Sequence, residues 1–139
     1  MSRTLLLSFC ACLAVAGLVA CKEPAATNGG DTIRPAQDIV IANVARYQPS
    51  DTSAEAGAVY LICTFRYTNT LGREFVPRIE KFTLEDASHR RFGGEESGSA
   101  ALVGISNDRN PLGANESRRY TAGFRVPQNF AGIMYYDPT

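Results

Sequence analysis

Apolar and polar residues alternate with a period of two along most of the chain after residue 37. The clearest case is the segment 58–68, in which every odd-numbered position is apolar or aromatic and the even-numbered positions from 64 onward are polar. This alternation is typical of a β-strand with one buried face. The Tyr60–Cys63 end is apolar on both faces, which predicts a central strand. The inward-facing set is Val59, Leu61, Cys63, Phe65 and Tyr67.

The same period predicts further strands separated by polar turns. No segment keeps the 3.6-residue period of an amphipathic helix over a useful length. About six to eight short strands favour an all-β, two-sheet antiparallel sandwich, because two packed sheets bury alternating faces that one sheet leaves in water. A break in the alternation near Lys81 predicts a bulge. The other predicted strands are 38–46, 77–85, 90–92, 116–126 and 131–136.

Residues 1–20 have the pattern of a signal peptide, because Arg3 precedes an apolar run from Leu5 to Ala20. A membrane-spanning helix needs about 20 apolar residues, more than this run supplies; an uncleaved leader that serves as an anchor is the alternative. Leu18–Ala20 followed by Cys21 resembles the bacterial lipobox. The resemblance implies cleavage before Cys21 and lipidation of its thiol. The alternative is an ordinary secretory signal with an incidental cysteine.

Lipidation would make the attachment firm. One acyl chain binds a membrane only marginally, and a cysteine of the lipobox type normally carries three chains. In lipoproteins of this kind, an aspartate after the cysteine commonly retains the protein at the inner membrane. Lys22 takes that position here, which implies export to the periplasmic face of the outer membrane.

Residues 21–36 are expected to form the lipidated cysteine and a flexible tether, and residues 37–139 a single domain. Pro24, Gly29, Gly30 and Pro35 interrupt regular structure in a segment with little apolar surface. A tether of about 15 residues spans roughly 20 Å on average. We therefore expect the domain to tumble beside the membrane.

Three further segments resemble a known family. The strand Tyr60–Asn69, the hairpin Phe82–Asp86 followed by Phe92, and the turn and strand Pro111–Pro127 are similar to telokin-like, immunoglobulin-like domains of secreted bacterial lipoproteins, mostly of unknown function. The resemblance covers residues 59–137 and implies an immunoglobulin-like sandwich at the cell envelope. It supplies no catalytic residues. The hairpin turn departs from the family pattern, since Ala87–Ser88 lacks the expected glycine.

The net charge limits the class of partner, and the cysteine content determines whether a disulfide can form. The formal net charge is zero, which argues against nucleic acid, because such a partner needs a basic face. Two of the four cysteines lie in the leader and Cys21 would be lipidated, so only Cys63 keeps a thiol and no internal disulfide can form. Its neighbours on the same face are Leu61 and Phe65, and we expect Cys63 to be an inert core residue.

The sequence contains no residue pattern that indicates catalysis or cofactor binding. His89 is the only histidine, and a turn residue in solvent explains it more simply than a triad, which needs a nucleophile, a base and an orienting group in hydrogen-bond reach. Zinc and copper sites need several Cys or His ligands. We therefore expect a protein that is not an enzyme and has no cofactor or metal.

Calcium is the one metal left open. The mostly irregular segment 93–114 contains an apolar patch at 100–105 and several oxygen ligands without EF-hand spacing. A solvated acidic loop is the favoured interpretation. The oxygen-bearing residues are Glu95, Glu96, Asn107, Asp108 and Asn110.

Two arginine doublets and aromatic residues near the C-terminus are the candidates for partner contact. Adjacent strand residues point to opposite faces, so each doublet offers one arginine to a given surface, and a patch requires the doublets to converge. The aromatic residues, with Phe130, form either a contact site or a cap on the sandwich. The candidate residues are Arg90, Arg91, Arg118, Arg119, Tyr135 and Tyr136.

These observations favour a membrane-anchored lipoprotein whose non-catalytic β-sandwich binds another cell-envelope protein, through loops or a sheet edge. The alternative is a periplasmic inhibitor or immunity protein that blocks a secreted enzyme or toxin, with the segment 93–114 entering a cleft.

Overall fold

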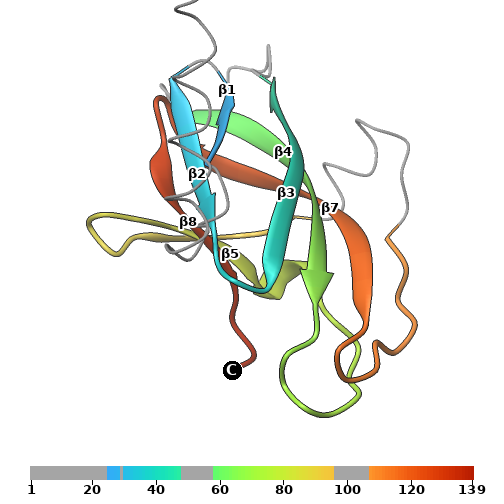
Figure 1. Ribbon diagram of the computed structural model, residues 1–139. Coiled ribbons are helices and arrows are strands. Elements are labelled where there is room, and N and C mark those ends of the chain that lie inside the picture. The colour runs from blue at the N-terminus through green and yellow to red at the C-terminus, as the bar shows by residue number, and fades with distance from the viewer. Residues whose placement is uncertain (1–24, 29, 48–57, 96–106) are drawn as a thin grey trace, which may run out of the picture.

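The computed structural model describes residues 25–28, 30–47, 58–95 and 107–139, and these form two packed β-sheets (Figure 1). One sheet has five strands in the order β1-β2-β8-β5-β6, and the other has three in the order β3-β4-β7. The predicted all-β, two-sheet sandwich is confirmed. The elements are β1 (Ala26–Asn28), β2 (Asp31–Pro35), β3 (Ile39–Tyr47), β4 (Ala58–Thr68), the 3-10 turn η1 (Ile79–Lys81), β5 (Phe82–Asp86), β6 (Arg91–Gly93), β7 (Ser117–Pro127) and β8 (Ala131–Tyr136).

Strand β4 is the centre of the three-stranded sheet, as its apolar run predicts. It pairs antiparallel with β7 from Ala58 to Thr68 and with β3 on its other side. The pairing with β3 shifts between Ile41 and Asn43, which leaves Ala42 as a bulged residue. The extra residue shifts the inward and outward alternation by one position, and as a result Val44 faces inward.

Strand β8 is the centre of the five-stranded sheet. It pairs antiparallel with β5 but parallel with β2, where Thr32 lies opposite Ala131 and Pro35 opposite Met134. The prediction of a fully antiparallel sandwich is therefore wrong at this pair. Strand β2 pairs antiparallel with β1 through a short turn, but β2 and β8 are far apart in the sequence, so no hairpin imposes antiparallel pairing on these two strands.

The expected tether 21–36 is wrong for its second half, because β1 and β2 are strands of the sandwich. Ile33 is fully buried, and the buried Asp31 carboxylate accepts a hydrogen bond from the Phe130 backbone N–H at 2.8 Å. The residues that break regular structure do not prevent this, since Gly30 lies in the turn between the strands and Pro35 is the last residue of β2. The sandwich thus begins at Ala26.

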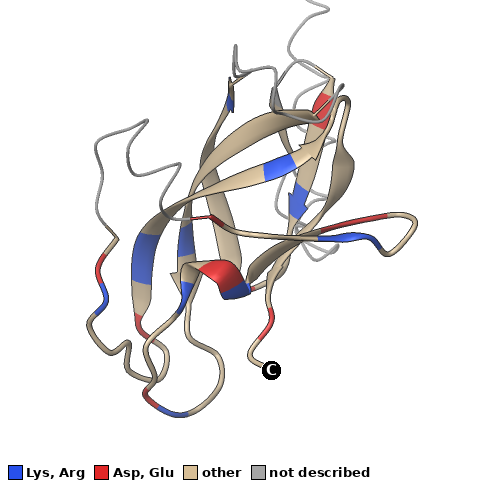
Figure 2. Cartoon of the chain, turned by 180° about the vertical axis from the view of Figure 1, so that it is seen from behind, with Lys and Arg blue, Asp and Glu red and all other residues tan. Residues whose placement is uncertain are grey.

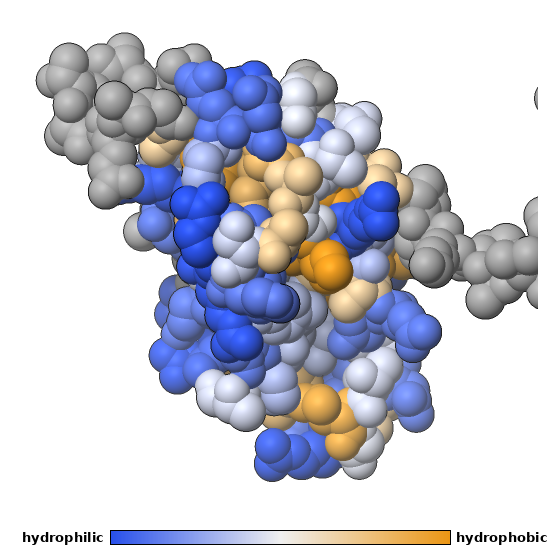
Figure 3. Space-filling model, turned by 90° about the vertical axis from the view of Figure 1, so that its left-hand side faces the viewer, coloured by the Kyte–Doolittle hydropathy of each residue, from blue (hydrophilic) through white to orange (hydrophobic). Residues whose placement is uncertain are grey.

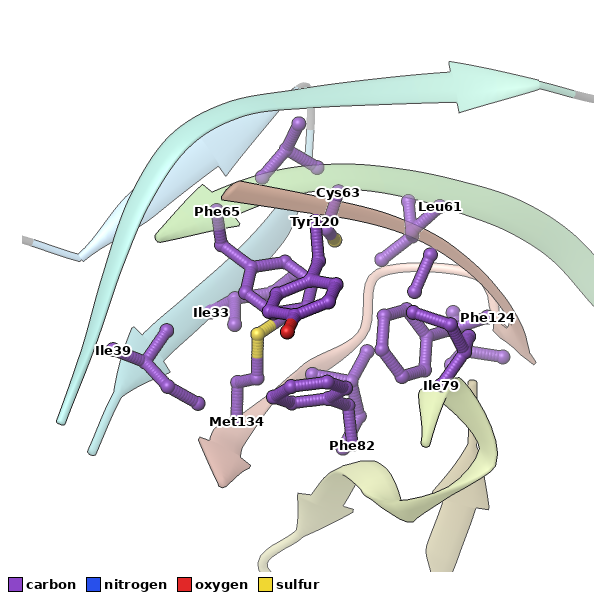
Figure 4. Packing of buried hydrophobic residues seen from close by; sticks show 14 of the residues in the cluster. Ile33, Ile39, Leu61, Cys63, Phe65, Ile79, Phe82, Tyr120, Phe124 and Met134 are labelled. Atoms are coloured by element: carbon purple, nitrogen blue, oxygen red, sulfur yellow. The ribbon is translucent and has the colours of Figure 1, made fainter. Parts of the chain in front are cut away.

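The core lies between the sheets and is rich in aromatic side chains (Figure 4). Phe82 packs against Phe65 and Tyr120, with ring centroids 4.7 and 5.4 Å apart. Cys63 is fully buried, and this burial raises the pKa of its thiol to about 12. The inward set predicted for β4 and the core position of Cys63 are confirmed.

One irregular segment differs from expectation, and the described ends of the segment 93–114, mostly irregular as expected, are bonded to β7. The alternation break near Lys81 marks the turn η1 rather than a bulge. Glu95 pairs through its backbone with Gly123 of β7, and the Asn107 amide bonds both backbone groups of Thr121. The apolar patch 100–105 lies outside the described residues, as do the leader and Cys21. In the described part of the chain, no helix has the length and apolar character needed to cross a bilayer.

Candidate functional site

The outward face of the five-stranded sheet carries a row of side chains from four strands. Strand register places Ile133 opposite Glu85 on one side and Arg34 on the other, and Arg91 opposite Glu85. Their neighbours in sequence, such as Ile33 and Met134, point into the core. Alternation therefore forces the row Arg34, Ile133, Glu85 and Arg91 to face outward.

This row crosses an open groove of about 860 Å³. Ile133 is 50 % exposed, which makes it the most exposed of the large apolar side chains in the described part of the chain. The space-filling view of this side shows apolar surface bordered by hydrophilic residues (Figure 3). We call it the Ile133 groove. Its lining residues are Thr32, Arg34, Glu85, Asp86, Ala87, His89, Arg91, Ala131, Gly132, Ile133 and Tyr135.

Glu85 organises one side of the groove. Its carboxylate accepts hydrogen bonds from His89 Nδ1 at 3.0 Å, Arg91 Nε at 3.0 Å and the Tyr135 hydroxyl at 2.8 Å. These bonds, led by that from His89, lower the pKa of the Glu85 carboxyl below its usual range. The arrangement fixes three polar side chains around an ionised centre, which prepares that rim for contact.

The opposite side of the groove carries a single cation. Arg34 is exposed, and its guanidinium group makes no hydrogen bond or ion pair among the described residues. The groove therefore has an unpaired positive charge, Arg34, on one side of Ile133. On the other side lies the Glu85 carboxylate, which already accepts three hydrogen bonds. Such a surface can hold an apolar side chain on its floor and an acidic group beside Arg34.

The hairpin between β5 and β6 supports the Glu85 side. The Asp86 carboxylate accepts bonds from the backbone N–H groups of Ser88 and Arg90, at 2.9 and 3.0 Å, and from Arg90 Nε at 2.7 Å. His89 takes the left-handed conformation (φ 63°) in place of the glycine that the turn lacks. Arg90 thus stabilises the turn and does not face the groove.

The two arginine doublets do not converge. Arg91 belongs to the Ile133 groove, whereas Arg119 lies on the outer face of the other sheet, opposite Arg66. Arg118 bonds the carbonyl oxygens of Asn110 and Pro111 and lies 3.4 Å from the Asp108 carboxylate.

The aromatic candidates also separate. Tyr135 lines the groove, while Tyr136 packs in the aromatic cluster, with its ring centroid 4.8 Å from that of Phe82. Phe130 is buried against Phe92. Of the six candidate residues, the groove brings together only Arg91 and Tyr135.

Sequence reasoning missed Ile133, Glu85 and Arg34. The available signal was an apolar residue at an outward position of the strand 131–136, where Ala131, Ile133 and Tyr135 share the face away from Met134. Ile133, Glu85 and Arg34 come together only because their strands are neighbours in the sheet. The order of strands in a sheet cannot be predicted from a local sequence pattern.

The oxygen ligands considered for calcium serve the fold where they are described. Asn107 is buried against β7, and Asp108 accepts the backbone N–H of Asn110 at 2.8 Å. Glu96 lies outside the described residues. Within the ranges that the structure describes, no three His, Cys, Asp or Glu side chains are grouped to hold a metal ion. His89 bonds the Glu85 carboxylate there rather than a hydroxyl or thiol.

No family model and no curated protein matches this chain. It is similar in structure to an uncharacterized β-sandwich protein from Clostridium difficile 630, at 14 % sequence identity and a TM-score of 0.37, over 85 % of this chain and 97 % of that one. Function is therefore inferred from the residues of the chain itself.

Proposed function

We propose that this chain is a lipid-anchored lipoprotein of the cell envelope whose non-catalytic, immunoglobulin-like sandwich binds another envelope protein through the Ile133 groove. The observation that carries the proposal is Ile133 itself, half-exposed at the centre of a face whose rim is charged and hydrogen-bonded. Ile133 does not stand alone, because it shares the groove with Ala87 and Ala131, and an apolar patch with a polar rim is typical of a protein–protein contact site.

The location rests on the sequence. The lipobox-like Leu18–Cys21 supports an acylated N-terminus, and Lys22 supports the outer membrane, with the domain on its periplasmic face. The family resemblance points to the same envelope address. His89, the only histidine of the sequence, bonds the Glu85 carboxylate rather than a hydroxyl or thiol, which supports binding rather than turnover.

The groove supplies the usual components of a recognition surface. Ile133 and Ala131 form an apolar floor, and Tyr135 and Arg91, residue types enriched at binding hot spots, are held in place by Glu85. The polar side chains of the rim are already held by hydrogen bonds, so they lose little conformational entropy when a partner binds. We expect one apolar side chain of the partner to rest on Ile133 and an acidic group to meet Arg34.

Site-specific photocrosslinking in cells tests this function. A photoreactive residue at Ala131, in the groove, is expected to give a discrete adduct with one envelope protein. The same residue at Leu71, an exposed loop position 39 % accessible, serves as the matched control and is expected to give none. Ile133→Asp should abolish the Ala131 adduct, while Leu71→Asp should preserve it.

The stability of both variants is measured alongside, because substitutions at exposed positions usually change stability by less than about 0.5 kcal/mol. Equal adducts at both positions, or an Ala131 adduct that survives Ile133→Asp in a folded protein, contradict the proposal. An adduct with a secreted hydrolase or toxin would instead favour the inhibitor alternative.

A further inference from the structure

The three-stranded sheet is basic although the whole chain is neutral. Strands β3, β4 and β7 contain five arginines and no aspartate or glutamate, while the formal net charge of the chain is zero. Viewed from behind, the strands themselves carry basic segments and no acidic ones (Figure 2), and Glu95 lies beside β7, where it pairs with Gly123. Two of the five, Arg46 and Arg118, lie opposite inward residues, 3.9 and 3.4 Å from the carboxylates of Asp31 and Asp108. The outer face of this sheet therefore carries three arginines, Arg66, Arg119 and Arg125, which give it a local positive field.

Two of these arginines form an unfavourable pair. Arg66 of β4 and Arg119 of β7 lie directly opposite each other, both exposed, and neither guanidinium group has an ion pair or hydrogen bond among the described residues. Like charges at opposed positions destabilise a sheet. The adjoining acidic residue, Glu95, pairs with Gly123 and is closer along β7 to Arg125 than to Arg119. Folding does not explain this pair, so an external anion is the natural counterpart.

Apolar and aromatic groups accompany the charges on the same face. Val40, 45 % exposed, lies opposite Arg66. Tyr47, 41 % exposed, lies opposite Tyr60, whose ring carries the Arg125 guanidinium 5.0 Å from its centroid. Arginine mixed with tyrosine and valine is the composition of a surface that meets lipid headgroups.

The start of the sandwich brings this face close to the anchor. Strand β1 contacts β3, the edge strand of the basic sheet. From Cys21 to Ala26, the first residue of β1, a fully extended chain reaches at most about 18 Å. A domain attached at Cys21 is thus held against the bilayer, not suspended from a long tether.

We propose that the outer face of the three-stranded sheet, through the exposed Arg66 and Arg119 near one end of the β4–β7 ladder, docks on the phosphate groups of an anionic membrane surface. The inference rests on the proposed lipid anchor for its geometry. It orients the molecule, because the Ile133 groove occupies the outer face of the other sheet and is turned toward partners.

Vesicle binding by an unlipidated chain tests the docking apart from the anchor. The chain of residues 21–139 with Cys21→Ser keeps all the described strands and the core. It is expected to cosediment with vesicles of phosphatidylglycerol and phosphatidylcholine, but not with phosphatidylcholine alone. The binding should weaken as salt rises.

Charge-matched variants locate the surface. Arg66→Gln with Arg119→Gln should lower the partition coefficient about 25-fold, because each arginine near an anionic surface contributes about fivefold. Arg73→Gln with Arg78→Gln removes the same charge from exposed residues outside the strands of this sheet, and binding should change less than about twofold. Unfolding temperatures check that both variants are folded, and removal of the opposed pair should not lower stability.

Failure of the unlipidated chain to prefer anionic vesicles overturns the inference, as does an equal loss in both double variants. An acidic protein in place of the membrane would give the first of these results. None of these outcomes depends on acylation or on the photocrosslinking partner, so failure of the docking and failure of the proposed function are separately visible.

Discussion

Asn69 offers the sharpest test of how the loops of the sandwich are held. It follows the last residue of β4 and is fully buried. Its Nδ2 group donates to the carbonyl oxygens of Arg73 at 2.7 Å, Leu112 at 3.0 Å and Gly113 at 3.1 Å, and its Oδ1 accepts the Leu71 N–H at 2.9 Å. One amide therefore joins the loop after β4 to the loop before β7.

The cost of Asn69→Ala follows from these bonds. The substitution removes the hydrogen-bond partner of three carbonyl oxygens and one N–H. Each buried group left without a hydrogen bond costs about 1–3 kcal/mol. Because only the bond to Leu112 is fully buried, we expect a total loss of about 3 kcal/mol. For a domain of this size, that lowers the unfolding temperature by roughly 15 °C.

Urea unfolding of the wild type and two variants measures the loss. Asn43→Ala, at an exposed position of β3, is the matched control and should change stability by less than about 0.5 kcal/mol. Asn69→Asp keeps the acceptor for Leu71 but sets a carboxylate against carbonyl oxygens, so it should be at least as damaging as alanine. A loss below about 1 kcal/mol for Asn69→Ala would refute the reasoning.

Three further predictions address the groove and the core. Because the folded pKa of Glu85 is lowered, its contribution to stability is complete above about pH 5 and is lost as the pH falls through the folded value; Glu85→Gln should flatten this acid-side decline in urea titrations, and an unchanged slope would count against it. Cys63 should resist alkylation at pH values well below 12 until urea unfolds the chain, and fast labelling of the folded protein would contradict its burial. Gly132→Ala should cost about 1–3 kcal/mol by calorimetry, since a Cβ there meets the Glu85 carbonyl oxygen and lies 2.6 Å from Phe130 Cζ; a neutral effect would show that β5 and β8 are less closely packed.

Local pattern was sufficient where a strand has one buried face. The bounds predicted for 58–68 and 131–136 agree with β4 and β8, and 116–126 differs from β7 by one residue at each end. These segments alternate strongly because sheet packing imposes a period of two on them. The parity break at Lys81 was also visible, although the pattern could not distinguish a bulge from a 3-10 turn.

Local pattern failed where strand identity depends on distant partners. Strands β1 and β2 look like a linker because Gly30 and Pro35 are present and Ile33 is the one large apolar residue in either strand. They become strands because β8 offers an open edge, which lies about a hundred residues later in sequence. A parallel pair of this kind leaves no turn signature.

The site was harder to predict than the fold for the same reason. Arg91 and Tyr135 were visible as candidate contacts, but Glu85, which holds both, becomes a centre only when β5 lies between β6 and β8. Residue type alone left contact site and cap open for the two tyrosines, and the structure divides them, since Tyr136 packs against Phe82 beside an outward Tyr135. Adjacent candidates in a strand serve opposite faces, and only the sheet order says which face matters.

The envelope address of the protein depends on lipidation of Cys21. Mass spectrometry of the chain purified from envelope membranes tests that dependence most directly. We predict an N-terminal peptide that begins at Cys21 and carries a thioether-linked diacylglyceryl group. A mature chain that begins at another residue, or that carries an unmodified Cys21 thiol, would contradict it.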